Sequence, residues 1–160
     1  MTADLGQMEH PLGLRRLGYA GATLAQPALI WDGGDPRATE EQVAEEVPVA
    51  LVYNGVPHVV MMASPEDLED FAVGFSLTEE LVAAPQEVSS IAIQRYGLGI
   101  EIQLTVSNAR AAAIAGRTRS LTGRTGCGIC GSATIEGVLK QLHPVPAGPA
   151  IAPVAVHRAL

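Results

Sequence analysis

The sequence predicts a mixed α/β domain between residues 43 and 142, in which β-hairpins pack against helices. Three observations support this fold class. Two stretches alternate apolar and polar residues and are interrupted by turn residues, which is typical of hairpins. Between them, apolar residues recur at helical spacing. The chain also has 160 residues, of which 48% are hydrophobic, and this is enough for one domain with a sizeable core.

Residues 1 to 42 are expected to form a flexible lead-in without regular structure. They combine glycines, prolines and mixed polarity with no sustained periodicity, and the tract WDGGDPRATEEQ is polar and rich in turn residues. The N-terminus lacks the compact apolar block of a secretion signal. No apolar run approaches the roughly 18 residues of a membrane span. We therefore expect no secretion signal and no membrane partner.

The first ordered element is expected to be a hairpin over residues 47 to 62. Apolar residues alternate from Val47 to Tyr53, and Asn54-Gly55 is a strong signal for a type I′ turn. We expect His58, in the second strand, to be a packing residue rather than a ligand. The hairpin could form the interface of a homodimer, but the favoured role of its apolar residues is packing in the core.

The segment SPEDLEDFAVGFSLTEELV predicts a helix. Ser64 is expected to cap it, and Pro65 suits the first helical position. The acidic residues that follow match the positive end of the helix dipole, so we interpret them as structural. Four residues at helical spacing are expected to face the core, namely Leu68, Phe71, Ala72 and Phe75.

The remaining elements follow in order along the chain. A second hairpin is predicted over residues 89 to 106, where apolar residues alternate on both sides of a glycine turn. A short helix is predicted over residues 109 to 119. Another is expected in SATIEGVLKQL, just after Cys130, with Ser132 as its cap. Residues 143 to 160 are interpreted as a proline-rich linker and the start of a truncated C-terminal part.

Both cysteines of the chain, Cys127 and Cys130, lie in the glycine-rich loop GRTGCGICG, residues 123 to 131. The formal net charge of −7 argues against general nucleic-acid binding. The loop nevertheless lies in a cationic segment, because no acidic residue occurs between Glu101 and Glu136. The arginines of this segment are Arg110, Arg117, Arg119 and Arg124.

Several classes of CxxC site can be weighed from the residues. A structural zinc site needs four ligands, whereas the chain has two cysteines, and the two histidines that follow them, His143 and His157, are too far apart to complete a finger. A zinc deaminase needs an upstream HxE, which is missing. A thioredoxin-like redox site stays an alternative, but that fold carries its CxxC early in a βαβ unit, whereas the motif here follows two predicted hairpins. Two buried structural thiols fit poorly with so many glycines.

Sulfur transfer fits the loop best. In this chemistry one thiolate accepts a sulfane sulfur as a persulfide and delivers it to an acceptor, which requires an ionised thiol and a mobile loop. Arg124, Arg119, Arg117 and the N-terminus of the following helix would stabilise the thiolate. The loop glycines would supply the mobility.

The segment EEVPVALVYNGVPHVVMMASPEDLEDFAVGFSLTEELV, followed by GRTGCGICG, closely resembles the FdhD family. These are sulfur-carrier proteins required for formate dehydrogenase maturation, and the resemblance runs from about residue 43 to the C-terminus. It implies a cytoplasmic sulfurtransferase that takes persulfide sulfur from a cysteine desulfurase. The acceptor would be the molybdenum or tungsten bis-molybdopterin guanine dinucleotide cofactor, before its insertion into formate dehydrogenase.

The resemblance also implies a cytidine-deaminase-like core with no bound metal of its own. Within the family pattern, Cys127 matches the persulfide carrier and Cys130 the second cysteine. Family members are expected to continue beyond the linker, so the full cofactor pocket is not expected in this chain. Arg124 is the first candidate to contact the cofactor phosphates, beside Arg119 and Arg117. A dithiol/disulfide redox protein using the same CxxC is the alternative.

Overall fold

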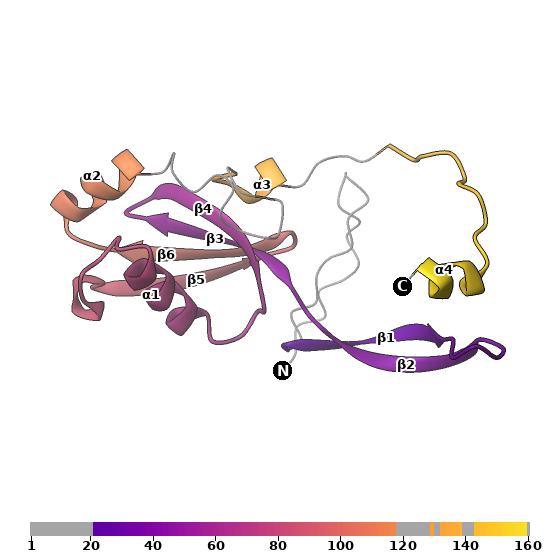
Figure 1. The fold of residues 1–160 in the computed structure, drawn as a ribbon. Helices are drawn as coiled ribbons and strands as arrows, with labels where there is room; N and C mark the ends of the chain where they lie inside the picture. Colours follow the sequence, from indigo (N-terminus) through magenta and orange to yellow (C-terminus); the bar gives the residue numbers. More distant parts are fainter. Residues whose placement is uncertain (1–20, 118–128, 130–131, 139–142, 160) are drawn as a thin grey trace.

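The computed structural model describes residues 21–117, 129, 132–138 and 143–159. In this part of the chain a two-stranded sheet precedes a four-stranded sheet with strand order β4-β3-β6-β5 (Figure 1). The strands are β1 (Thr23–Ile30), β2 (Arg37–Ala44), β3 (Val47–Tyr53), β4 (Val56–Ala63), β5 (Ser90–Tyr96) and β6 (Gly99–Thr105). The helices are α1 (Leu68–Thr78), α2 (Asn108–Arg117), α3 (Ile135–Val138) and α4 (Pro153–Ala159), with a 3-10 turn at Pro85–Glu87. The predicted α/β class is confirmed.

The four-stranded sheet consists of the two predicted hairpins, placed side by side. β3 pairs with β4, and β5 pairs with β6, in antiparallel register. The hairpins meet through a parallel pairing in which Val49–Tyr53 of β3 lies along Ile100–Leu104 of β6. Asn54 and Gly55 have φ angles of 48° and 80°, as the predicted type I′ turn requires.

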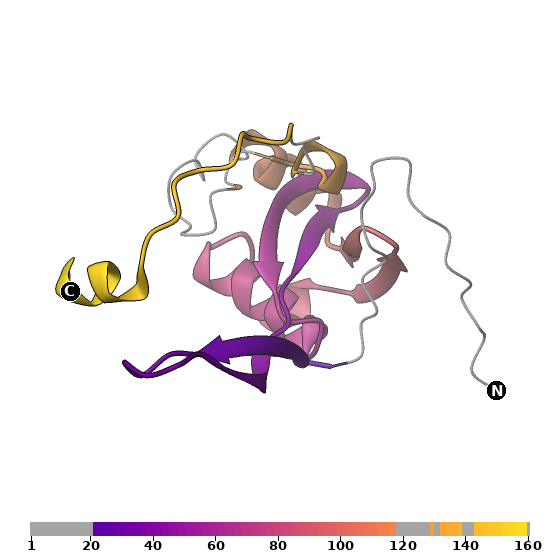
Figure 2. The same ribbon diagram turned by 90° about the vertical axis from the view of Figure 1, so that its right-hand side faces the viewer.

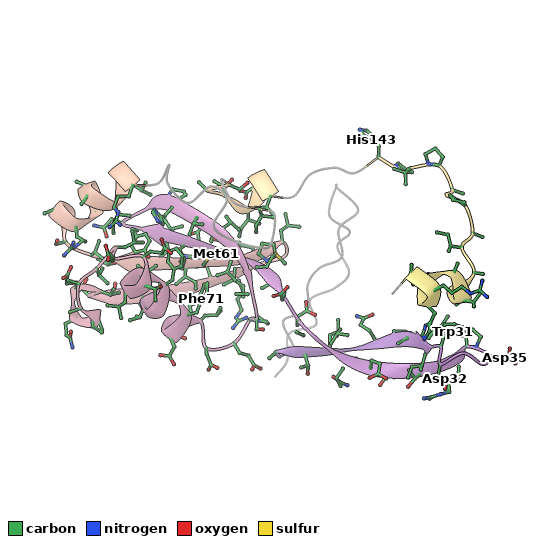
Figure 3. All side chains as sticks on the ribbon, in the orientation of Figure 1. Trp31, Asp32, Asp35, Met61, Phe71 and His143 are labelled. Carbon is green, nitrogen blue, oxygen red and sulfur yellow. The ribbon has the colours of Figure 1, made fainter. Side chains whose placement is uncertain are left out.

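The main core lies between one face of this sheet and helices α1 and α2. Leu68 and Ala72 of α1 are fully buried, and Phe71 and Phe75 are half-buried against the same core, so the predicted core face of the helix is confirmed. Met61 of β4 packs there as well, and Figure 3 labels it together with Phe71. All seven residues of β3 are buried, because the strand has neighbours on both sides and side chains cover both faces.

The predicted start of α1 is wrong. The helix begins at Leu68 rather than beside Ser64, and its N-cap residue is Asp67, in the left-handed conformation with φ 50° and no capping hydrogen bond from its side chain. The reason is tertiary. The chain leaves β4 only after Ala63, and the Pro65 carbonyl accepts a hydrogen bond from the Arg95 guanidinium at 3.2 Å instead of one from a helical amide.

The predicted absence of regular structure before residue 42 is wrong for residues 23–30 and 37–42. Strands β1 and β2 form an antiparallel ribbon that runs in continuous register from Thr23↔Ala44 to Ile30↔Arg37. Backbone pairing, rather than an apolar periodicity, defines this element, since most of its side chains are exposed. Figures 1 and 2 show the ribbon extending away from the four-stranded sheet. The expected lead-in over residues 1–20 lies outside the described residues.

Residues 143–152 form no helix or strand and lead into α4. The His157 ring of α4 meets the Trp31 ring near the tip of the ribbon edge to face, with centroids 5.0 Å apart. In Figure 3 the label of Trp31 lies beside α4. Among the residues that the structure describes, we find no helix long and apolar enough to cross a membrane.

Candidate functional site

The structure describes the helix that precedes the cysteine loop, one residue within the loop and the segment directly after it. Cys127, Cys130, Arg119 and Arg124 lie outside the described residues, so their predicted roles stay predictions. Arg117 ends α2 on the near side of the loop, and Ser132 begins the described segment on the far side. Ile129 lies between the two cysteines in sequence and is described.

Ile129 packs on the face of the sheet opposite the main core. Its side chain is half-buried in a small apolar cluster built around Ala50 of β3, Val60 of β4 and Ile135 of α3. Ala50 pairs with Val60 across the two strands, and successive strand residues point to opposite faces, so both side chains point away from α1. The cluster therefore fixes one residue of the CxxC motif to the sheet.

A backbone hydrogen bond fixes the chain just after the motif. The Val60 amide of β4 donates to the Ser132 carbonyl at 3.1 Å, and the Ser132 amide donates to the Ile129 carbonyl at 3.3 Å. Because β4 is an edge strand, its outward amide would otherwise have no strand partner. Ile129 thus attaches to the sheet through its side chain, and Ser132 through its backbone.

Helix α3 then continues from this attachment. The prediction that a helix starts just after Cys130 with Ser132 as cap is wrong, because α3 begins at Ile135 and the Gly137 amide donates to the Thr134 hydroxyl at 3.2 Å. Ser132 lies two residues before Thr134, the residue that directly precedes the helix, and its carbonyl accepts the Val60 amide of β4. The helix N-terminus proposed to stabilise the thiolate is thus farther along the chain from Cys130 than the sequence suggests.

Close packing between α3 and the sheet depends on a glycine. A Cβ atom on Gly99 would lie 2.5 Å from the Pro48 carbonyl oxygen and 2.9 Å from Cδ1 of Ile135. The sequence indicated Gly99 only as part of the glycine turn in the second hairpin, not as a site of close packing, and Ile129 was not singled out. Ile129 could have been, since it is the sole large apolar residue in GRTGCGICG.

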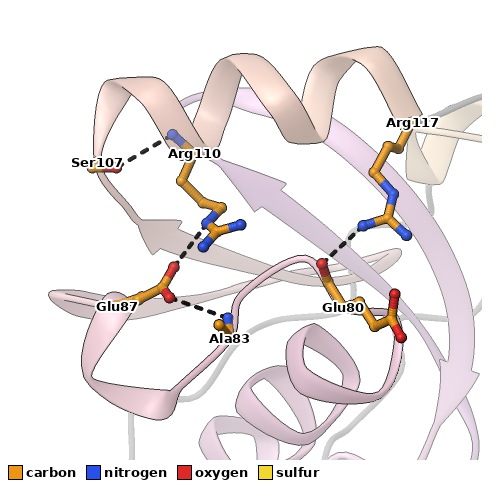
Figure 4. A network of polar contacts seen from close by, with 6 residues as sticks. All are labelled: Glu80, Ala83, Glu87, Ser107, Arg110 and Arg117. Atoms are coloured by element: carbon orange, nitrogen blue, oxygen red, sulfur yellow. Dashed lines mark hydrogen bonds and ion pairs between the residues drawn. The ribbon is translucent and has the colours of Figure 1, made fainter.

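On the near side, the arginines of α2 hold the helix to the segment that follows α1 (Figure 4). The Arg117 guanidinium donates to the Glu80 carbonyl at 2.8 Å. Arg110 pairs with the Glu87 carboxylate at 2.7 Å, and the other oxygen of that carboxylate accepts the Ala83 amide at 3.2 Å. Both arginines therefore have partners within the fold. A cofactor contact by Arg117 stays a prediction and would have to share or replace the bond to Glu80.

His58 is a buried histidine within the main core. It occupies the irregular position in the β3–β4 register, is 4% exposed, and neither ring nitrogen has a hydrogen-bond partner. Its ring meets those of Tyr53 and Phe75 edge to face, with centroids 5.5 and 6.3 Å away. The predicted packing role is confirmed. Burial lowers the pKa of His58 below its ordinary value, and the effects of Glu79, which raises it, and Arg117, which lowers it, are smaller.

Tyr53 and Ser76 form a buried polar pair beside His58. The Ser76 hydroxyl donates to the Ala72 carbonyl at 2.6 Å, so the Tyr53 hydroxyl is the donor in the 2.7 Å bond between the two side chains. Burial raises the pKa of Tyr53 to about 12, although the bond to Ser76 acts in the opposite direction. Among the described residues, no three His, Cys, Asp or Glu side chains lie close enough together to hold a metal ion.

Two comparisons bear on this arrangement. The model of the FdhD/NarQ family matches residues 44–160, a range that includes the cysteine loop. Among solved structures, the chain is similar to a crystal structure from Desulfotalea psychrophila that is described as a formate dehydrogenase accessory protein. The TM-score is 0.48 and the identity 25%, and the match covers 53% of this chain and 36% of that one. The chain therefore spans little more than a third of that protein.

Proposed function

Because the chain belongs to the FdhD/NarQ family, we propose that it acts in formate dehydrogenase maturation as a sulfur carrier. The observation that carries this proposal is the family match across residues 44–160, within which both cysteines fall. The proposed donor is a cysteine desulfurase in the cytoplasm. The proposed acceptor, as substrate rather than resident cofactor, is molybdenum or tungsten bis-molybdopterin guanine dinucleotide.

The proposed loading step is a thiolate attack on a persulfide. The Cys127 thiolate attacks the terminal sulfur of the persulfide on the donor enzyme, the S–S bond of the donor breaks, and the donor cysteine leaves as a thiolate. Cys127 then carries the persulfide. No external oxidant or reductant is needed, because one S–S bond forms as another breaks.

The second cysteine has a proposed role in delivery. The Cys130 thiolate attacks the inner sulfur of the Cys127 persulfide, a disulfide forms between the two cysteines, and hydrosulfide leaves toward the acceptor. The two electrons that reduce the sulfane sulfur come from the thiol pair, so a cellular thiol reductant must regenerate the dithiol. The CxxC spacing supports this role because it places the two thiols within reach of each other.

Arg124 is the proposed first contact of the loop with the cofactor phosphates, and Arg119 and Arg117 are secondary. A guanidinium fork matches phosphate geometry. The existing bond from Arg117 to Glu80 favours Arg124 over Arg117 for this role, since binding through Arg117 would cost an interaction that the fold already uses.

Intact mass measurement tests the loading step. The reduced protein is incubated with a cysteine desulfurase and cysteine, and we expect a mass gain of one sulfur that a thiol reductant removes. Cys127→Ala should abolish the gain. Cys130→Ala should keep some loading but weaken transfer to the cofactor. If Cys127→Ala loads normally and the label lies on Cys130, the assignment of the carrier is wrong.

The same experiment separates the alternative function, a dithiol/disulfide redox protein. That function predicts a loss of two hydrogens on oxidation and no gain of sulfur from the desulfurase. A non-catalytic scaffold would support maturation even when both cysteines are alanine. Loss of formate dehydrogenase activity in cells that carry the double variant would therefore rule out a scaffold role.

A further inference from the structure

We infer that a groove beside the first turns of α2 binds a small molecule with one carboxylate and a compact apolar body, and that Arg110 contacts the carboxylate. The groove lies between the segment that precedes β5, the residues that follow β6 and the start of α2. The inference does not depend on the proposed function. Every residue that lines the groove is described, and none of them belongs to the cysteine loop.

The groove has the size of a small-molecule site. Its volume is about 690 Å³, and ligand pockets in proteins usually measure about 300–1,000 Å³. Part of its lining is apolar, namely Val106, Ala109 and Ala113, so a ligand can bury apolar surface there. An inorganic ion would fill only a small part of this volume. An aromatic or aliphatic acid would contact both the apolar wall and the polar groups.

Hydrogen bonds within the fold fix the walls of the groove. The Asn54 side chain holds both backbone groups of Val106, because its Nδ2 donates to the Val106 carbonyl and its Oδ1 accepts the Val106 amide, each at 2.8 Å. On the opposite wall, the Ser89 amide donates to the Thr105 carbonyl at 2.8 Å. A preformed site loses less conformational entropy on binding than a site that must first become ordered.

Arg110 supplies hydrogen-bond donors to the groove. Its Nε donates to the Glu87 carboxylate at 2.7 Å, and its two terminal nitrogens donate to no other described residue (Figure 4). The side chain is 34% exposed, so the fork formed by these nitrogens is accessible to a ligand. The Ser107 hydroxyl accepts the Arg110 amide at 3.2 Å, which leaves its hydrogen for a ligand. A guanidinium fork beside a hydroxyl donor suits a planar carboxylate.

Glu87 disfavours a ligand with more than one negative charge. One oxygen of its carboxylate pairs with Arg110, and the other accepts the Ala83 amide at 3.2 Å, so both oxygens are already bonded. The carboxylate still lies beside the site and repels a further negative charge. A phosphate group carries more than one negative charge near neutral pH, so the same site should bind it less well than a carboxylate. The groove thus suits a monoanion.

The experiment titrates benzoate, whose single carboxylate is joined to a compact apolar ring. Benzamide is the matched compound with the same shape and no charge, and inorganic phosphate has the charge without the apolar body. Each compound is added to the isotope-labelled full chain at constant ionic strength, and amide chemical shifts are followed by nuclear magnetic resonance. The variants are Arg110→Gln, Arg110→Lys and the control Arg37→Gln, which removes the same charge from β2, outside the groove.

Benzoate should shift the amides of Ser107, Ala109 and Arg110 and saturate with a Kd of about 1–10 mM, as expected for so small a ligand. Benzamide and phosphate should each bind at least about fivefold more weakly. Arg110→Gln should raise the Kd for benzoate by about tenfold, because the charged fork is lost. Arg110→Lys keeps a charge that can pair with Glu87 but lacks the fork, so its Kd should lie between the two. Arg37→Gln should leave the Kd unchanged.

The absence of a saturable shift with benzoate would overturn the inference. An equal Kd in Arg110→Gln and the unchanged chain would do the same, since benzoate would then bind without Arg110. Tighter binding of phosphate than of benzoate would refute the carboxylate ligand. Sulfur loading is a separate measurement. A chain that binds benzoate in the groove but gains no sulfur from a cysteine desulfurase would refute the carrier role and retain this site.

Discussion

Replacement of Gly99 by alanine tests how the segment after the cysteines is held on the sheet. The glycine is the first residue of β6, and its φ is not in the left-handed region, so backbone conformation alone would permit alanine. The obstacle is steric. The added Cβ would lie 2.5 Å from the Pro48 carbonyl oxygen and 2.9 Å from Cδ1 of Ile135.

The expected magnitude follows from what must move. The carbonyl belongs to the backbone of β3, which is paired on both sides and cannot shift cheaply. Overpacking a core costs roughly 1–3 kcal/mol. Displacing the buried Ile135 side chain adds part of the roughly 1.5–3 kcal/mol that its burial contributes. We therefore expect Gly99→Ala to lower the free energy of unfolding by about 2–4 kcal/mol.

Thermal and urea unfolding, followed by circular dichroism, measure this loss. For a folded domain of about 100 residues, a loss of about 2 kcal/mol in the free energy of unfolding lowers Tm by roughly 8 °C or more. Gly74→Ala is the matched control, since nothing lies within 4 Å of its Cβ position in α1. Alanine there should stabilise the chain by about 0.5–1 kcal/mol. The steric argument fails if Gly99→Ala unfolds at the same urea concentration as the unchanged chain.

Three further predictions concern the core and α2. Burial lowers the pKa of His58 below its ordinary 6.5, so the unfolded chain binds a proton at a higher pH than the folded chain does. The free energy of unfolding should therefore fall as pH drops below 6.5 toward the folded-state pKa. In urea titrations, His58→Leu should remove this pH dependence. Ser76→Ala should lower the free energy of unfolding by about 1–3 kcal/mol, because it leaves the buried Tyr53 hydroxyl without an acceptor. Tyr53→Phe should lower it less, because Ser76 still donates to the Ala72 carbonyl. Equal losses in the two variants would contradict this order. Arg110→Gln should lower the free energy of unfolding by less than about 1 kcal/mol, and by less still in 1 M salt, because the ion pair with Glu87 is about one-third exposed. A loss of stability that is the same in high salt would contradict an ionic origin.

The elements that could be predicted from the sequence are those with strong local patterns. The hairpins of the four-stranded sheet follow from alternating apolar residues and from turn signals such as Asn54-Gly55, which act within a few residues. The core face of α1 follows from spacing, since Leu68 and Ala72 must lie on one side of any helix that contains them. The family resemblance likewise followed from quoted segments, and the match to residues 44–160 agrees with it.

The positions that could not be predicted depend on contacts between distant segments. The ribbon of β1 and β2 has no apolar periodicity, so only the pairing of one strand with the other defines it. Helix α1 begins later than predicted because the chain remains in β4 up to Ala63 and because the Arg95 guanidinium donates a hydrogen bond to the Pro65 carbonyl. Each of these outcomes depends on a partner elsewhere in the chain, which a local pattern does not identify.

The sequence by itself determined which reactive groups the loop carries, because the side-chain types and the CxxC spacing are set by the covalent chain. It also placed that loop among arginines and glycines. Only the tertiary structure decided where the motif is attached. Ile129 meets Ala50 and Val60 because β3 pairs with β4 so that both side chains share the outer face, and Ser132 reaches Val60 because β4 is an edge strand. Burial and hydrogen bonding between segments about 70 residues apart depend on the whole sheet having formed, so no local pattern could specify them.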